Sequence, residues 1–168
     1  MPDLGYIIGR GREPPPFPFP TPQPGGPVNT VHEDLVPFVE QHVDWHRHLG
    51  IKVEEVRTGY ARLRLPFREE FAGNKSRGAL HGGVISTLAD ICGNVALWTH
   101  FGPNDLVSTV DMRVDFLRPA PFADLIAEAD VRLQGYRIGN IFVRIASETA
   151  PGVAVAEGRI VCYVKRAE

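Results

Sequence analysis

One stretch restricts the fold of this chain more than any other. The segment "HGGVISTLADICGNVALW", His81 to Trp98, reads as a helix that is apolar on nearly every side. Between Gly78 and Phe101 only Asp90 carries a full charge at neutral pH. A helix with apolar residues all round is normally buried inside a protein. The rest of the chain is therefore expected to surround this helix.

Most of the chain outside this helix alternates between apolar and polar residues, which is the pattern of strands buried on one face. Residues 51–67 read as a hairpin, with Thr58 and Gly59 at its turn. Four more alternating stretches are separated by short turns, which predicts antiparallel neighbours: 106–119, 123–135, 137–150 and 153–166. Their apolar faces need a partner, and the buried helix is the only candidate. We expect an α+β fold in which a curved antiparallel sheet wraps around a long central helix.

The first 30 residues contain nine of the 15 prolines. Fixed φ angles and missing N–H groups exclude both helix and ladder there. Residues 1–29 are therefore predicted to be an extended arm, either disordered or lying across a partner subunit. The remaining residues, 30–168, are expected to form one domain, with a polar loop at residues 68–80.

The domain is predicted to start with a helix from Thr30 to about His48, because apolar residues recur there at helical spacing. Thr30 and Glu33 have the spacing of a capping box. Pro37 interrupts the pattern and predicts a break or kink.

Composition excludes several classes of partner. The formal net charge of −2 provides no basic field for binding nucleic acid. Cys92 and Cys162 stand far apart without ligand spacing, which is typical of reduced, cytosolic cysteines. We find neither an export signal nor a stretch apolar enough to span a bilayer, so a cytoplasmic location is expected. His42 and His46 have the spacing of zinc ligands, but no third ligand accompanies them, and we predict no metal.

Asp90 lies on a polar stripe of the central helix with Ser86, Thr87 and Asn94. Such a stripe either faces solvent or forms the wall of a narrow, wet pocket. Solvated helix faces normally carry Lys, Arg or Glu, which this stripe lacks, so the pocket is favoured. A carboxylate in a semi-apolar pocket is poorly solvated, which makes it a better base or nucleophile.

The same helix begins at His81-Gly82-Gly83, where two glycines leave backbone N–H groups unobstructed. These donors, at the positive end of the helix dipole, suit a developing oxyanion. Eight residues, roughly 12 Å of helix, separate Gly82 from Asp90, so the two cannot serve one carbonyl from one chain. An antiparallel second copy would bring Gly82 of one chain near Asp90 of the other, which predicts a homodimer.

The stretches "NKSRGALHGGVISTLAD" and "VSTVDMRVDFLRPA" resemble the PaaI-like acyl-CoA thioesterases of the hotdog-fold superfamily. The resemblance runs from about Leu49 to Tyr163 and rests on G-x-x-H-G-G, an Asp nine residues after the His, and T-V-D-M. It implies a hotdog fold and hydrolysis of an acyl-CoA thioester to a free acid and coenzyme A. It implies water as the second substrate, no cofactor, and a homodimer or a dimer of dimers.

The resemblance also assigns roles to residues of this chain. Asp90 matches the carboxylate that attacks the thioester carbonyl or activates the attacking water. Gly82 matches the glycine whose N–H polarises that carbonyl from the opposite subunit, and His81 matches a positioning or polarising histidine beside it.

Further positions follow in the same way. Thr109 matches a hydroxyl that orients the water, with Ser108 as the neighbouring alternative. Asn74 matches a loop asparagine, although it precedes His81 by seven residues where related sequences have six. Contacts to the substrate are implied at Gly83, Ser108, Asp111, Arg118, Pro119 and Arg137.

Two other functions use the same pocket. A hotdog hydratase or dehydratase would normally carry an H-F-P-G pattern, which this sequence lacks. A non-catalytic acyl-CoA-binding protein would normally need an added output domain, which the proline-rich arm does not provide. Both remain alternatives to the thioesterase.

Overall fold

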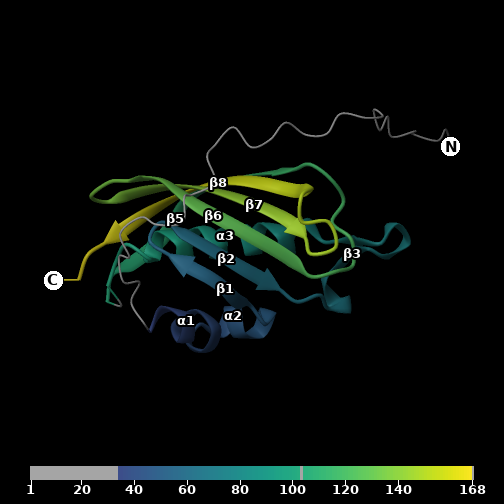
Figure 1. Ribbon diagram of the computed structural model, residues 1–168, viewed down its shortest axis with the longest axis horizontal. Helices are drawn as coiled ribbons and strands as arrows, with labels where there is room; N and C mark the ends of the chain where they lie inside the picture. Colours follow the sequence, from purple (N-terminus) through teal and green to yellow (C-terminus); the bar gives the residue numbers. More distant parts are fainter. Residues whose placement is uncertain (1–33, 103, 168) are drawn as a thin grey trace.

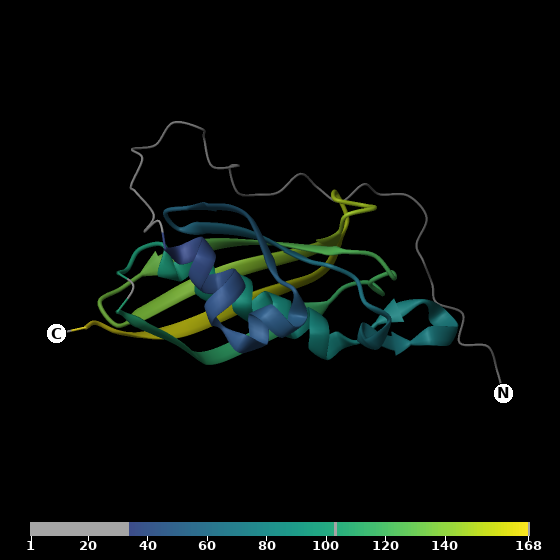
Figure 2. The ribbon, with the colours of Figure 1, turned by 90° about the horizontal axis from the view of Figure 1, so that it is seen from below.

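The buried helix of the sequence is α3 (Gly82–Trp98), which lies across one face of a six-stranded sheet (Figure 1 and Figure 2). A computed structural model describes residues 34–102 and 104–167. His81 precedes the helix in extended conformation and caps it, and Thr99 ends it. The side chains of α3 that the fold buries point in several directions, as predicted: Ile85, Leu88, Ala89, Ile91, Cys92, Val95, Ala96 and Leu97.

The sheet is antiparallel throughout, and its strands run in the order β1-β2-β6-β7-β8-β5. The predicted hairpin is present, with Gly59 at φ +76° in its turn. The predicted fold class, a curved antiparallel sheet around a long helix, is confirmed. The strand bounds are β1 Lys52–Arg57, β2 Tyr60–Leu65, β5 Leu106–Phe116, β6 Leu125–Gln134, β7 Ile138–Ser147 and β8 Ala154–Lys165.

The strand order corrects one expectation. The stretches 106–119 and 123–135 were expected to be neighbours, but β5 pairs with β8 and β6 pairs with β2 and β7. The connection between β5 and β6 contains Pro119 and Pro121, which cannot donate in a ladder. The result leaves β1 and β5 as the two edges of the sheet.

The N-terminal helix is shorter and more broken than expected. The chain forms α1 (Leu35–Pro37), a π-helical turn η1 (Phe38–His42) and α2 (Asp44–Leu49). Pro37 ends α1, and Val43 is extended between η1 and α2. These turns pack on the end of α3, where the rings of Phe38 and Trp98 meet edge to face. The predicted cap at Thr30 and Glu33 and the arm at 1–29 lie outside the described residues.

The expected loop at 68–80 contains a small hairpin, β3 (Ala72–Asn74) with β4 (Ala79–Leu80), flanked by the turns η2 (Glu69–Phe71) and η3 (Lys75–Arg77). This hairpin projects from one end of the sheet, beside the start of α3 (Figure 2). The His81 N–H donates to Phe71 O at 2.8 Å, and Leu80 N–H donates to Ala120 O at 2.9 Å. The hairpin therefore fixes the position of the helix start.

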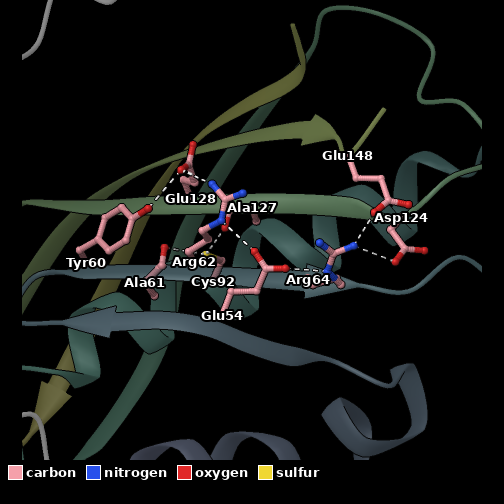
Figure 3. A network of polar contacts seen from close by, with 10 residues as sticks. All are labelled: Glu54, Tyr60, Ala61, Arg62, Arg64, Cys92, Asp124, Ala127, Glu128 and Glu148. Carbon is pink, nitrogen blue, oxygen red and sulfur yellow. Dashed lines mark hydrogen bonds and ion pairs between the residues drawn. The ribbon is translucent and has the colours of Figure 1, made fainter. Parts of the chain in front are cut away.

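The outer face of β1, β2 and β6 carries a network of ion pairs (Figure 3). Arg62 and Arg64 both bind Glu54, and they extend the network to Glu128 and Asp124. Partly exposed ion pairs of this kind contribute little individually. The opposite face of these strands meets α3, where the thiol of Cys92 donates to Ala127 O at 3.4 Å.

Among the residues that the structure describes, no helix is long and apolar enough to cross a membrane. His42 and His46 each place Nδ1 against a backbone carbonyl, of Pro37 and Val39 respectively. The described part of the chain holds no group of three His, Cys, Asp or Glu side chains able to bind a metal ion.

The contact between β7 and α3 generates a stability prediction. A Cβ atom at Gly139 would lie 2.6 Å from Leu97 Cδ1, and Leu97 is fully buried, so its side chain cannot move into solvent. We expect Gly139→Ala to lower the free energy of unfolding by about 1–3 kcal/mol through overpacking, measured by urea unfolding. Gly152→Ala is the control, because a Cβ there meets nothing within 4 Å. Equal losses in the two variants would contradict the prediction.

Candidate active site

Asp90 lies on the side of α3 that faces β5, and its carboxylate is held from two directions. Thr109 Oγ donates to Asp90 Oδ1 at 2.6 Å, and Asn94 Nδ2 donates to the same oxygen at 3.1 Å. Oδ2 accepts no hydrogen bond from the residues that the structure describes. The half-buried carboxylate therefore has one anchored oxygen and one that is open to a ligand.

The local structure of β5 decides which hydroxyl reaches Asp90. A bulge between Thr109 and Asp111 interrupts the pairing with β8, where Thr109 is opposite Cys162. Thr109 points toward α3, and neighbouring residues of a strand point to opposite faces. Of the two hydroxyls considered from the sequence, Thr109 is the one that bonds Asp90, and Ser108 is not.

The start of α3 presents its first amide outward. His81 Nδ1 accepts from Gly83 N–H at 2.9 Å, so the neutral imidazole carries its proton on Nε2. The Gly82 N–H donates to no other described residue. A Cβ at Gly82 would lie 3.3 Å from the ring of Phe116. A free amide, an exposed imidazole N–H and the positive end of a 17-residue helix dipole together suit an oxyanion.

Asn74 lies near this helix start and far from Asp90 along the helix. Its Oδ1 accepts from Ser76 Oγ at 2.8 Å and from Arg77 N–H at 3.2 Å, so the side chain caps η3. The adjacent Gly73 is packed so tightly on His81 that a Cβ there would lie 2.7 Å from His81 Cα. Asn74 therefore belongs with His81 and Gly82.

A pocket of about 260 Å³ adjoins Gly82. Most of its side chains are apolar, but polar atoms contribute as much of its surface as apolar atoms do; the lining residues are Leu80, Gly82, Ile85, Phe116, Leu117, Arg118, Pro119 and Ala120. Arg118 is tied to the backbone, since Nη1 donates to Ala154 O at 2.9 Å. The apolar side chains of this cavity suit the carbon chain of a ligand.

The other residues implied for substrate binding are dispersed over the surface. Asp111 Oδ2 pairs with Arg159 at 3.2 Å on the outer face of the sheet. Arg137 is exposed at the turn between β6 and β7, with its guanidinium over the Tyr136 ring. Neither residue meets Asp90 within one chain.

The candidate residues thus form two groups at different positions on α3. Asp90, Thr109 and Asn94 make one group, and Gly82 and His81 begin the other. About 12 Å of helix separates the groups, so one chain does not bring an amide and a carboxylate to the same carbonyl.

Sequence reasoning placed Asn94 on the polar stripe but gave it no role. Its spacing from Asp90, one helical turn, was a usable signal. Cys162 was not recognised from the sequence, and the packing of Phe116 against Gly82 was not predicted. Their proximity to the two groups depends on the pairing of β5 with β8 and on the contact of β5 with α3.

Comparison with known proteins agrees with this architecture. Residues 77–154 match the thioesterase superfamily. The chain is 35% identical over 138 residues to a proposed esterase of Halobacterium salinarum, covering 76% of this chain and 90% of that protein. It is 26% identical over 128 residues to the medium/long-chain acyl-CoA thioesterase YigI of Escherichia coli, covering 68% of this chain and 83% of that relative.

Solved structures give the same result. A protein from the thioesterase superfamily superimposes with a TM-score of 0.73 at 33% identity, covering 82% of this chain and 99% of that one. The PaaI protein of E. coli superimposes with a TM-score of 0.63 at 25% identity, covering 73% and 83%. The chain belongs to the thioesterase superfamily, has its hotdog fold, and is a member of a family of hydrolases.

The cap at the start of α3 generates a prediction that is independent of substrate. Because His81 is exposed, His81→Ala removes the acceptor of the Gly83 N–H with little loss of packing. We expect the free energy of unfolding to fall by about 1 kcal/mol, as it does when other capping side chains are removed. His81→Asn keeps an acceptor at this position and should recover most of that loss. Unchanged urea unfolding in His81→Ala would show that the cap is not formed in solution.

Proposed function

We propose that this protein is an acyl-CoA thioesterase that hydrolyses an acyl-CoA to the free acid and coenzyme A. The observation that carries the proposal is the carboxylate of Asp90, which is anchored through Oδ1 by Thr109 and Asn94 and open at Oδ2. The thioesterase family of the chain and the acyl-CoA thioesterase activity for which its relative YigI is named support the choice of thioester.

The proposed reaction uses groups of two subunits. Asp90 Oδ2 accepts a proton from water as the water oxygen adds to the thioester carbonyl. The partner's Gly82 N–H donates to the carbonyl oxygen as it becomes negative. The C–S bond then breaks, and the thiolate takes the proton that Asp90 holds. The carboxylate is restored, and no metal or redox cofactor enters the reaction.

The acyl chain is proposed to lie against the apolar side chains of the pocket beside Gly82. Leu80, Ile85, Phe116 and Leu117 line it, and the relative YigI is named for medium and long acyl chains. An apolar lining favours aliphatic chains over short polar acids, because each buried CH₂ contributes about 0.8 kcal/mol. The site is therefore expected to prefer medium or longer acyl groups.

A thiol-release assay on a panel of acyl-CoAs of increasing chain length tests this function. We expect wild type to release coenzyme A and Asp90→Asn to be slower by at least about 100-fold, because the amide cannot accept the proton of water. Asp44→Asn is the matched control, since that carboxylate is 88% exposed on α2. Binding without turnover across the panel would favour a non-catalytic acyl-CoA-binding protein instead.

The second subunit is proposed to join at β5. This edge strand of 11 residues exposes Val110 (59%), Met112 (38%) and Phe116 (54%). The other edge, β1, is protected: its residues are largely charged, and Glu40 accepts from Val53 N–H at 2.8 Å. A long apolar edge strand is a template for pairing with another chain. Pairing β5 with its own copy continues the sheet across a two-fold axis.

Side-chain direction and charge restrict the register of this pairing. Asp111 and Arg113 lie on the outer face of β5, and Met112 and Val114 lie on the inner face. Residues that are directly opposite each other in an antiparallel pair lie on the same face of the sheet. Two copies of β5 meet this condition only when the two-fold axis passes through a residue and not between two residues. A two-fold axis through Asp111 or Arg113 places that residue opposite its own copy, so that like charges face each other. Centring on Met112 places Asp111 opposite the partner's Arg113, and centring on Val114 places Arg113 opposite the partner's Asp115.

The site distinguishes these two remaining registers. Thr109 marks the position of Asp90 along β5, and Phe116 marks the position of Gly82. The bulge adds Val110 as an extra residue, so with the axis at Met112 Thr109 is opposite the partner's Val114, within the strand and two residues from the partner's Phe116. With the axis at Val114, Thr109 is opposite the partner's Arg118, beyond the end of the strand at Phe116. We therefore propose the register centred on Met112.

Single-cysteine variants test both the dimer and its register. In the proposed register Met112→Cys meets its own copy at about 4.5–5.5 Å between Cα atoms, within disulfide range. Val114→Cys is the matched control, because its copies are offset by four residues, about 13 Å. Under mild oxidation we expect a covalent dimer of Met112→Cys alone on a non-reducing gel. The native Cys92 and Cys162 are fully buried and give no background.

The opposite result, in which Val114→Cys cross-links and Met112→Cys does not, would select the other register. A monomeric mass of the wild type by light scattering would contradict the dimer itself.

A further inference from the structure

We propose that Asn94 is a positioning residue of this site and that Cys162 fixes the orientation of its amide. The inference rests on the proposed function and extends it to two residues outside the reacting groups. Asn94 is on α3 one turn after Asp90, and Cys162 is on β8 opposite Thr109. Together they form a second layer behind the carboxylate.

The hydroxyl of Thr109 has only one proton, and the neighbouring groups determine which atom accepts it. An ionised carboxylate only accepts, so the 2.6 Å contact to Asp90 Oδ1 uses that proton. Thr109 Oγ must then act as the acceptor in its 2.8 Å contact with Asn94 Nδ2. The amide group of Asn94 is thus required to present its NH₂ to Thr109.

The remaining contacts of Asn94 agree with this orientation. Besides Thr109 Oγ, Nδ2 faces Asp90 Oδ1 at 3.1 Å and the backbone oxygen of Asp90 at 2.9 Å; all three are acceptors, and they share its two N–H protons. Oδ1 faces the sulfur of Cys162 at 3.5 Å. A flipped amide would direct its oxygen at three acceptors and its NH₂ at a thiol.

Cys162 supplies the proton that this orientation needs. The residue is fully buried, and burial raises the pKa of its thiol to about 11, so the thiol is protonated at neutral pH. Its S–H donates to Asn94 Oδ1, while Thr109 Oγ lies farther away at 3.9 Å. The thiol therefore acts as a fixed donor and not as a nucleophile.

The consequence is a carboxylate with a defined open side. Asp90 Oδ1 receives one donor from β5 and one from its own helix, which restricts rotation of the carboxylate. Oδ2 is then directed toward the position proposed for water. Loss of Asn94 should therefore lower kcat more than it changes KM, because Asn94 does not contact the substrate.

The first experiment compares Asn94→Ala and Asn94→Asp with wild type in the thiol-release assay. We expect kcat to fall about tenfold in Asn94→Ala with KM nearly unchanged, the scale of one hydrogen bond to a charged group. Asn94→Asp places a second carboxylate within hydrogen-bond distance, and two such groups cannot both ionise freely. Because the reaction needs ionised Asp90, the acid limb of the pH–rate profile should move to higher pH.

Other titratable groups near Asp90 bear on that profile. Cys162 faces the carboxylate from β8 and stays neutral over the measured range. His46 on α2 interacts electrostatically with Asp90, and burial lowers the pKa of its imidazole. The partner's His81 would join them in the proposed dimer. These groups are common to wild type and variant, so a shift confined to Asn94→Asp reports the introduced carboxylate.

The second experiment tests Cys162 and does not depend on the folding of the Asn94 variants. Cys162→Val removes the donor at similar volume, and we expect kcat to fall several-fold; Cys162→Ser keeps a donor and should recover most of the loss. Cys92→Val is the matched control, because that thiol bonds backbone carbonyls of β2 and β6 away from the site. Its kcat should equal that of wild type.

The outcomes separate the inference from the proposed function. An active wild type that Asp90→Asn inactivates, together with wild-type kcat and pH profile in Asn94→Ala and Cys162→Val, would overturn the positioning roles alone. Equal kcat losses in Cys162→Val and Cys162→Ser would overturn the role of the thiol proton. An Asp90→Asn variant as active as wild type would overturn the proposed function first.

Discussion

The packing of α3 against one face of the sheet is the constraint from which the other features follow. The helix contacts β2, β5, β6, β7 and β8, and the turns before β1 cover its far end. Almost every side chain of α3 must therefore be apolar. The exception is the stripe that faces β5, where Asp90 and Asn94 find the hydroxyl of Thr109. The only charge on the helix is tolerated because donors from two elements reach it.

The position of β5 at the edge of the sheet explains why this polar contact can be useful. A carboxylate facing a central strand would be covered on all sides, whereas one facing an edge strand stays half-buried. The same edge exposes the apolar side chains of Val110, Met112 and Phe116. In the proposed dimer, one strand holds the acid in place and also joins the two subunits.

Periodicity was sufficient to predict the elements but not their neighbours. The central helix, the first hairpin and the four long strands follow from local patterns of apolar residues. Whether β5 pairs with β6 or with β8 depends on contacts between residues about 50 positions apart, for which Leu106–Phe116 carries no local signal. The break at Val43, which is extended between η1 and α2, likewise has no proline or glycine beside it that would predict it.

The residues of the candidate site also divide into those that a local motif identifies and those that depend on which strands are neighbours. Asp90, Gly82 and His81 lie within one helix and its cap, and their motif identified them in the sequence. Thr109 could be separated from Ser108 only by the face of β5 on which each lies. Cys162 became visible only once β8 was placed beside β5, 68 residues from Asn94. Groups that act through a neighbour carry no motif of their own.

The rigidity of α3 gives the proposed dimer its physical reason. A helix fixes the separation of Gly82 and Asp90, and no side-chain movement closes about 12 Å. At one end, β3 and β4 fix His81 and Gly82, with Gly73 packed against the His81 backbone. Near the middle of the helix, β5 and β8 hold the acid. In the proposed dimer, a two-fold axis at Met112 would place the start of one helix beside the middle of the other, so each subunit would complete the site of its partner without any change in its own fold.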